Sequence, residues 1–248
     1  MIYKLKNITA QEIWFQEEIA NTKADIVFYF QMKDYVQGAN KFTTLLIDLK
    51  QEEEAIQKNF AKTVRNEINR AIIKDNLSVN IYDKSINNEI VTEFHKICNN
   101  FNLERNKPPV KIQDTNNFIK NNQLIITNVS CNLEVLVWHT YIKKDNRIRL
   151  KTSNSAFLNL DNEKKNLIGR ANKLLHWEDM KYFKSQGYQL YDFGGWYDGD
   201  SDQKLLGINK FKESFGGYKE ESYNYTRAIT LKGKLYLFLS NLKSKLRK

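Results

Sequence analysis

Residues 166–217 read NLIGRANKLLHWEDMKYFKSQGYQLYDFGGWYDGDSDQKLLGINKFKESFGG and contain most of the ten glycines of this chain. Apolar residues recur every three or four positions over 171–183, which predicts a helix with one core-facing stripe. Gly187 is expected to end this helix, because glycine adopts the left-handed conformation at a helix end without a steric penalty. A short apolar strand, 188–193, then leads into a glycine pair at 194–195 and a second helix.

Two parts of this stretch suggest a ligand site. A loop expected at residues 166–172 carries Gly169 and Arg170 to a helix start, where free N–H groups and the helix dipole bind anions, phosphate above all. The glycine pair at 194–195 lets a ligand approach the strand end closely. Each feature also has a purely structural explanation, since glycine relieves crowding before a helix and paired glycines commonly form turns.

Six motifs of the chain are informative together. They are GRANKLLHWEDM, YDFGGW and INKFKESFGG in this stretch, and VWHTYI at 137–142, RLKTSNSAF at 149–157 and IDLKQEEEAIQKNFAKTVRNEINRA at 47–71. In these motifs the chain resembles the acyltransferase relatives of the Fem-type nonribosomal peptidyltransferases. This resemblance implies an α+β fold of the GNAT-like (acyl-CoA N-acyltransferase) type, a mixed sheet with helices on both faces in which two neighbouring strands splay apart around the donor. A shortened N-terminal α/β half, 1–110, would pack with the catalytic half, 111–248, as one unit.

Composition narrows the class of protein. With 41% hydrophobic residues the chain can form a packed core, and its apolar runs are too short to span a membrane. The N-terminus lacks the order of a signal peptide, and the two cysteines match no metal site or disulfide framework. The net charge of +10 fits an enzyme whose substrates carry phosphates, since no RNA- or DNA-binding motif is found. We therefore expect a cytoplasmic, soluble protein with no metal, for which nucleic acid is not the main partner.

Periodicity predicts further elements outside the central stretch. A capping-box spacing at residues 9–12 predicts a helix over 9–20. Apolar residues at every fourth position over 56–72 predict one long helix with a core-facing stripe. We expect a meander of three strands within 124–152. A basic amphipathic helix is expected over 231–248, for which docking on the core is a commoner arrangement than contact with an acidic membrane.

Acyl transfer to an amine needs a proton acceptor, donors for the oxyanion and neutralisation of the leaving group. His139 in VWHTYI is the leading base, because imidazole titrates near neutral pH and strand alternation puts it on one face with Val137 and Tyr141. A hydrogen-bonded strand histidine is the structural alternative. Asp192 in YDFGG is the leading carboxylate, which orients a partner, acts as the base or ties down the glycine turn. His176 is expected to pack within the central helix.

Ten residues are predicted to bind the two substrates. The donor site, which would hold the pyrophosphate of coenzyme A, is Gly169, Arg170, Ala171 and Asn172. The acceptor site is Arg65, Arg70, Trp196, Tyr197, Lys210 and Lys212. An aromatic pair with lysines suits a nucleotide-linked sugar, where a base stacks and a diphosphate is neutralised. Exposed lysines, a core tryptophan and arginines that complement a helix dipole are the structural alternatives.

Three functions fit these features, and we rank them in this order. The first is transfer from acyl-CoA to the amino group of a nucleotide-linked amino sugar, such as a dTDP-amino-dideoxy sugar, for bacterial surface polysaccharide such as lipopolysaccharide. The second is a Fem-type peptidyltransferase that uses aminoacyl-tRNA and acts on a peptidoglycan precursor. The third is a non-catalytic binder of nucleic acid or an anionic surface. Direct attack by the amine is preferred over a covalent acyl-enzyme, because Cys98 and Cys131 have no visible activating base.

Overall fold

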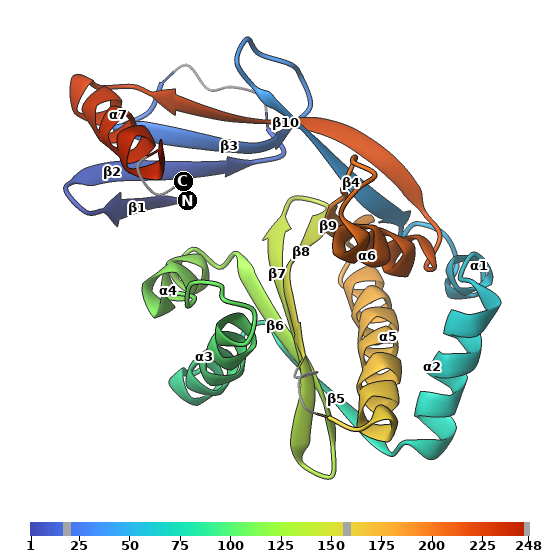
Figure 1. Cartoon of the computed structure of the whole chain (residues 1–248). Coiled ribbons are helices and arrows are strands. Elements are labelled where there is room, and N and C mark those ends of the chain that lie inside the picture. The colour runs from blue at the N-terminus through green and yellow to red at the C-terminus, as the bar shows by residue number, and fades with distance from the viewer. Residues whose placement is uncertain (17–20, 156–159, 246–248) are drawn as a thin grey trace. The chain divides into compact units, whose positions relative to one another are not determined.

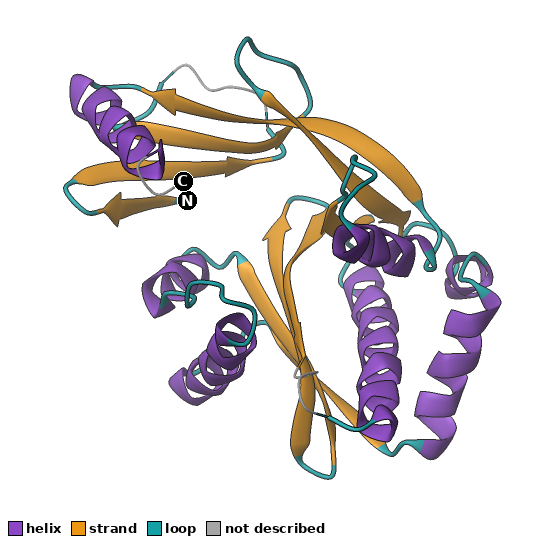
Figure 2. Cartoon of the chain, in the orientation of Figure 1, coloured by secondary structure: helices purple, strands orange, loops and turns teal. Residues whose placement is uncertain are grey.

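The computed structural model describes residues 1–16, 21–155 and 160–245, and Figure 1 traces their path. These residues form ten strands and seven helices (Figure 2). In this part of the chain, no helix is both long enough and apolar enough to cross a membrane. Within the same ranges, no group of three or more His, Cys, Asp and Glu residues is placed to hold a metal ion.

The described residues divide into two compact units. The smaller unit combines Met1–Thr44 with Glu220–Lys248, and the larger unit is Leu45–Lys219. This division differs from the halves expected at 1–110 and 111–248. The strands Leu77–Tyr82 and Leu124–Cys131 lie on either side of position 110 and pair with each other in one sheet of the larger unit. A boundary at position 110 would therefore cut through this sheet.

The larger unit is built on a mixed sheet. Its strand order is β9-β8-β7-β6-β5, and every pair is antiparallel except the parallel pair β8–β9. Its strands are β5 (Leu77–Tyr82), β6 (Leu124–Cys131), β7 (Glu134–Lys144), β8 (Arg147–Ser155) and β9 (Leu190–Gly195), and β4 (Asn40–Asp48) ends in this unit. Its helices are α1 (Glu53–Lys58), α2 (Lys62–Lys74), α3 (Asn88–Leu103), α4 (Ile112–Lys120), α5 (Asn162–Ser185) and α6 (Gln203–Glu213).

Helices cover both faces of this sheet, as Figure 2 shows for α3 on one side and α5 on the other. Strand alternation explains the two faces, because neighbouring residues of β7 point in opposite directions. Trp138 packs against Phe94 of α3 with ring centroids 6.1 Å apart. His139, the next residue, reaches Asn172 of α5 instead. The mixed sheet with helices on both faces confirms the predicted fold class.

The apolar residues at every fourth position from 56 to 68 are buried as predicted, but they do not lie on one helix. The chain forms α1 and α2 with a break at residues 59–61. Phe60 lies in this break and packs edge-on against Trp177 of α5, with ring centroids 5.4 Å apart. Ile72, which the same periodicity placed in the core, is 57% exposed.

Strands β8 and β9 splay apart, as the fold class predicts. They pair only at Arg147↔Leu190, Ile148↔Tyr191 and Arg149↔Asp192, although both strands continue beyond these pairs. Gly194 follows the last pair with a φ of +72°, and a Cβ there would lie 3.1 Å from the carbonyl oxygen of Leu150. A glycine is therefore required where the two strands separate.

The smaller unit contains β1 (Ile2–Leu5), β2 (Ile8–Trp14), β3 (Ile26–Met32) and, from Glu220 onwards, β10 (Tyr218–Ala228) in that order, and α7 (Leu231–Lys245). The predicted helix over 9–20 is wrong for the residues that the structure describes, since β2 pairs antiparallel with β1 and parallel with β3. The N–H of Thr9 accordingly meets the Asp25 carboxylate at 2.8 Å. Pairing on both edges of β2 outweighed the local capping pattern, and residues 17–20 lie outside the described residues.

Candidate active site

A cavity of about 1130 Å³ lies within the larger unit where β8 and β9 separate. Its walls come from β8, the end of β9, helices α5 and α6, and the segment that follows α3. Two chemical types of side chain dominate them. The apolar residues are Phe101, Leu150, Phe193, Leu205, Ile208 and Phe211, and the basic residues are Arg105, Lys107, Arg149, Lys151, Lys204 and Lys212. Such walls suit a ligand that combines apolar groups with negative charge.

Lys212 is a buried cation of this cavity, with 8% exposure. Its Nζ donates to the carbonyl oxygen of Gly194 at 3.3 Å and to that of Gly195. Burial lowers the pKa of this ammonium from its ordinary 10.5 to about 8, although Asp192 favours the charged form. Because an ammonium has three N–H donors, one remains for a ligand after these two bonds.

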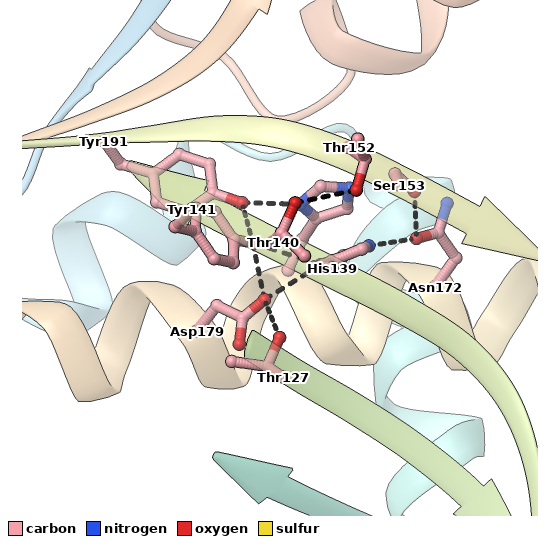
Figure 3. Close-up of polar contacts among 10 residues, drawn as sticks. Thr127, His139, Thr140, Tyr141, Thr152, Ser153, Asn172, Asp179 and Tyr191 are labelled. Carbon is pink, nitrogen blue, oxygen red and sulfur yellow. Dashed lines mark hydrogen bonds and ion pairs between the residues drawn. The ribbon is translucent and has the colours of Figure 1, made fainter. Parts of the chain in front are cut away.

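A buried carboxylate on α5, Asp179, lies at the centre of a polar cluster (Figure 3), and Asp179 itself does not line the cavity. Its Oδ2 accepts from the Tyr141 hydroxyl at 2.5 Å, from His139 Nδ1 at 2.9 Å and from the Thr127 hydroxyl at 3.2 Å. Asp179 and these three partners are all at 0% exposure. The three donors come from β6 and β7 and fix the carboxylate in place.

The hydrogen bonds determine the tautomer of His176. Because Tyr141 donates its proton to Asp179, the 2.8 Å contact between the hydroxyls of Tyr141 and Tyr191 requires Tyr191 to be the donor. The 2.6 Å contact between Tyr191 and His176 then requires the Nδ1–H of His176 to donate. Burial raises the pKa of both tyrosines well above 10, and both keep the protons that this chain needs. His176 therefore carries its proton on Nδ1 and a lone pair on Nε2.

His176 also lines the cavity, unlike His139. Burial, together with the charges of His139, Lys212 and Lys173, lowers the pKa of His176 well below 6.5. The imidazole is consequently neutral at pH 7, and its Nε2 carries a lone pair, although the lowered pKa makes this nitrogen a weaker proton acceptor than a free imidazole. The sequence predicted a packing and hydrogen-bonding role for this residue, and the structure adds contact with the cavity.

His139 does not line the cavity but contacts Asn172, which does. Its ring is fully buried, with Nδ1 bonded to Asp179 and Nε2 at 2.8 Å from Oδ1 of Asn172. Asn172 itself lines the cavity, where its Oδ1 also lies 3.5 Å from the Ser153 hydroxyl (Figure 3). This geometry suits His139 to holding Asn172 in position, and the predicted role as base remains a prediction.

Asp192 forms a buried ion pair at the start of the splay. Its Oδ2 accepts from Arg147 at 3.0 Å (Nε) and 2.6 Å (Nη2), and its Oδ1 accepts from the N–H of Gly194 at 2.7 Å. Both carboxylate oxygens are used to hold the strand end and the glycine turn. Of the three roles expected for Asp192, this geometry fits the structural one, and Asp179 is the carboxylate linked to the cavity.

The predicted donor loop at 166–172 is wrong. These residues lie inside α5, which begins at Asn162 after an N-cap at Asp161 whose side chain accepts from the N–H of Lys164 at 2.7 Å. N–H groups in the second and third turns of a helix bond to earlier carbonyls and are closed to a phosphate. The spacing of apolar residues did not indicate where α5 begins. An N-cap Asp161 followed by Glu163 in the first turn is a sequence signal for a helix N-terminus.

The four predicted donor residues therefore separate. Arg170 pairs with Asp75 at 2.6 and 3.0 Å, and Ala171 is buried in the core. Gly169 faces open space, since a Cβ added to it would meet no described atom within 4 Å beyond its own helix. Only Asn172 reaches the cavity.

The six predicted acceptor residues separate as well, and of them only Lys212 lines the cavity. Arg65 donates to the carbonyl oxygen of Lys58 at 3.0 Å at the end of α1, and Arg70 lines a second, polar cavity of about 750 Å³ beside Asp75. The remaining three have other surroundings. They are Trp196, which lies 4.0 Å under the Lys219 ammonium, Tyr197, which bonds to Asn209, and Lys210, which is exposed.

Sequence reasoning missed Asp179 and the role of the tyrosines. A signal was present, since Asn172, His176 and Asp179 are spaced by four and three residues and share one face of α5. Polar residues within the core-facing stripe of a long helix indicate a buried polar cluster.

No protein-family model matches the sequence, and no curated protein sequence matches it. Among solved structures, FemX is similar over 87% of this chain and 74% of its own chain, with 14% identity and a TM-score of 0.62. L-PGS from Bacillus licheniformis is similar over 86% of this chain and 71% of its own, with 12% identity and a TM-score of 0.54. The fold is Fem-related and GNAT-like. At 14% and 12% identity, these similarities show the fold and assign no role to individual residues.

Proposed function

We propose that this chain is an acyltransferase that moves an acyl group from an activated donor to an amine in the cavity between β8 and β9. One observation carries the proposal. A buried ammonium, Lys212, and a neutral imidazole, His176, line the same cavity at the separation of two parallel strands. The two groups supply the oxyanion donor and the proton acceptor that acyl transfer requires.

The reaction would proceed by direct attack. The amine nitrogen bonds to the donor carbonyl carbon, the oxyanion accepts the third N–H of Lys212, and the amine proton passes to Nε2 of His176. The bond from the carbonyl carbon to the donor's sulfur or oxygen then breaks, and His176 returns the proton to that leaving atom. Cys98 does not compete as a nucleophile, since burial raises its pKa to about 12 and its thiol bonds to Asn154 at 3.0 Å.

The acceptor would be an amine that carries phosphate, such as a nucleotide-linked amino sugar for surface polysaccharide. The basic side chains around the cavity support this substrate class, with Lys107, Lys151 and Lys204 contributed by three separate segments. Arg105 adds a guanidinium that stacks 3.6 Å above the Phe101 ring. Apolar residues of α6 on the same cavity would contact the acyl chain or a base.

The donor is either coenzyme A thioester or aminoacyl-tRNA, and one observation argues against a coenzyme A pyrophosphate at the start of α5. The described start of α5 has an acidic cap, Asp161, and an acidic first turn with Glu163, which repel a pyrophosphate. The fold that this chain shares with FemX and L-PGS supports a Fem-type donor. We therefore place an aminoacyl ester ahead of acyl-CoA.

The test measures binding and transfer with both donors. Isothermal calorimetry with coenzyme A and with bulk tRNA identifies the donor, and radiolabelled donors with a panel of nucleotide-linked amino sugars report transfer. Lys212→Met should lower kcat/KM by about 100-fold or more, the usual loss for an oxyanion donor. Lys210→Met is the matched control, since Lys210 lies on the same helix and does not line the cavity. Equal activity of the two variants, or no transfer from either donor, would refute the proposal.

A further inference from the structure

Helix α7 turns an apolar stripe towards solvent. Five large apolar residues are exposed on it, namely Leu231 at 82%, Leu235 at 59%, Phe238 at 62%, Leu239 at 50% and Leu242 at 44%. Their spacing of four, three, one and three residues places them on one face of the helix. The helix docks on the smaller unit, as expected from the sequence, but through another face, and this apolar face stays exposed.

The opposite side of α7 holds the helix to the smaller unit. A Cβ on Gly233 would lie 2.2 Å from the carbonyl oxygen of Asp25, and the helix backbone rests directly on the chain there. The Thr230 hydroxyl donates to the Asp25 carboxylate at 2.7 Å and accepts from the N–H of Gly233 at 3.1 Å, which caps the helix. Close backbone contact and a polar anchor thus fix α7 with its apolar stripe outward.

The charge of this segment is of one sign. Residues 229–248 contain no Asp or Glu and six Lys or Arg, and the whole chain carries a net charge of +10. Lys232 and Lys234 are exposed in the first turns of α7. A second copy of the chain would bring like charges together, whereas an anionic lipid surface would complement them.

We propose that α7 binds the surface of an anionic phospholipid bilayer and lies in the plane of the interface. The stripe of Leu235, Phe238 and Leu242 enters the boundary between headgroups and acyl chains, and the lysines contact the headgroup phosphates. The inference stands on α7 alone and does not depend on the acyl transfer proposed for the larger unit.

The test is co-sedimentation of the full chain with vesicles of phosphatidylcholine alone and of phosphatidylcholine with about 30% phosphatidylglycerol, a lipid of the anionic class that attracts basic segments. The wild type should bind the anionic vesicles and lose binding as salt rises. Leu235→Glu with Phe238→Glu should lower the partition coefficient about tenfold or more. Lys234→Gln should lower it roughly fivefold, the share of one lysine at such a surface.

The matched control is Ile73→Glu. Ile73 is 77% exposed on α2, a basic helix that also carries Arg70 and Lys74, and it is not part of the stripe. This variant should bind the vesicles as the wild type does, and circular dichroism should report the same helix content for every variant. Binding that is lost equally in the stripe and control variants would overturn the proposal. So would a wild-type dimer in light scattering that the stripe variant converts to a monomer while no variant binds vesicles.

Discussion

Helices α5 and α7 depart from the usual distribution of residues in opposite ways. Helix α5 buries His176 and Asp179, at 1% and 0% exposure, within the larger unit. Helix α7 leaves Leu235 and Phe238 at 59% and 62% exposure on the smaller unit. Both arrangements oppose folding, because a buried polar group is desolvated and an exposed apolar side chain gains nothing from the core.

The two helices differ in whether the rest of the chain supplies hydrogen-bond partners for the polar residues of α5 and apolar contacts for the stripe of α7. The polar groups of α5 find partners on neighbouring strands, since Oδ2 of Asp179 accepts three hydrogen bonds and His176 bonds to Tyr191. The apolar stripe of α7 stays 44–82% exposed and is only partly covered by the described residues of its own chain. Buried polar residues whose partners lie within the chain thus indicate a candidate catalytic site. Exposed apolar residues that the chain does not cover indicate a surface that binds another molecule or a membrane.

The largest effect is expected on the free energy of unfolding, when one leucine of each helix is replaced by alanine. Leu175→Ala on α5 should lower the free energy of unfolding by about 2–5 kcal/mol, because Leu175 is fully buried and leaves a cavity. Leu235→Ala on α7 should change it by no more than about 0.5 kcal/mol. Urea denaturation measures both. A loss for Leu235→Ala as large as that for Leu175→Ala would mean that the stripe is buried in solution.

The next effect is the pH dependence of stability from Lys212. The ammonium has a pKa of about 8 when folded and 10.5 when unfolded, and the unfolded chain holds more protons between these values. The wild type should therefore gain unfolding free energy relative to Lys212→Met as pH rises through this window. The full gain is about 3 kcal/mol, the 2.5-unit pKa difference at about 1.4 kcal/mol per unit. Urea titrations of both proteins at pH 7, 9 and 10 test the sign, and a constant difference would contradict it.

A smaller effect is expected from Asp179→Asn, which keeps the shape of the side chain and removes its charge. The loss should be about 1–3 kcal/mol, because the uncharged amide oxygen that takes the place of Oδ2 accepts the three hydrogen bonds more weakly than the carboxylate does. The amide nitrogen then takes the place of Oδ1, which has no hydrogen-bond partner among the described residues. Tyr141→Phe is the control that removes one donor and leaves the carboxylate. Imidazole ¹⁵N spectra should report an Nδ1–H tautomer for His176 in the wild type, because the chain of donors from His176 through Tyr191 and Tyr141 ends on Asp179. An Nε2–H tautomer in the wild type would contradict the hydrogen-bond chain.

Periodicity along the chain predicted much of the larger unit. The helix expected from the stripe over 171–183 lies within α5, and the three strands expected within 124–152 are β6, β7 and β8. Strand alternation also placed His139 on the face that carries Val137 and Tyr141, as the structure confirms. These predictions succeed because side-chain period follows from backbone geometry over a few residues.

Helix ends and polar partners were predicted less well. The start of α5 was expected near Gly169 and lies at Asn162, and the helix expected at residues 9–20 is strand β2 over its described part. Glycines and capping spacings are local signals that tertiary pairing overrides. The residues of the predicted donor and acceptor sites dispersed for the same reason, and Asn172 and Lys212 alone reach the cavity.

The sequence by itself determined the fold class, the apolar stripe of α5 and the splayed pair of strands, since each depends on short-range period or on a recognisable motif. Only the tertiary structure decided that Asp179, forty residues from His139, is the carboxylate of the buried cluster. It alone also showed that α7 turns its apolar stripe outward. Hydrogen-bond partners and the face that a helix buries are set by packing between distant segments, and no local pattern encodes them.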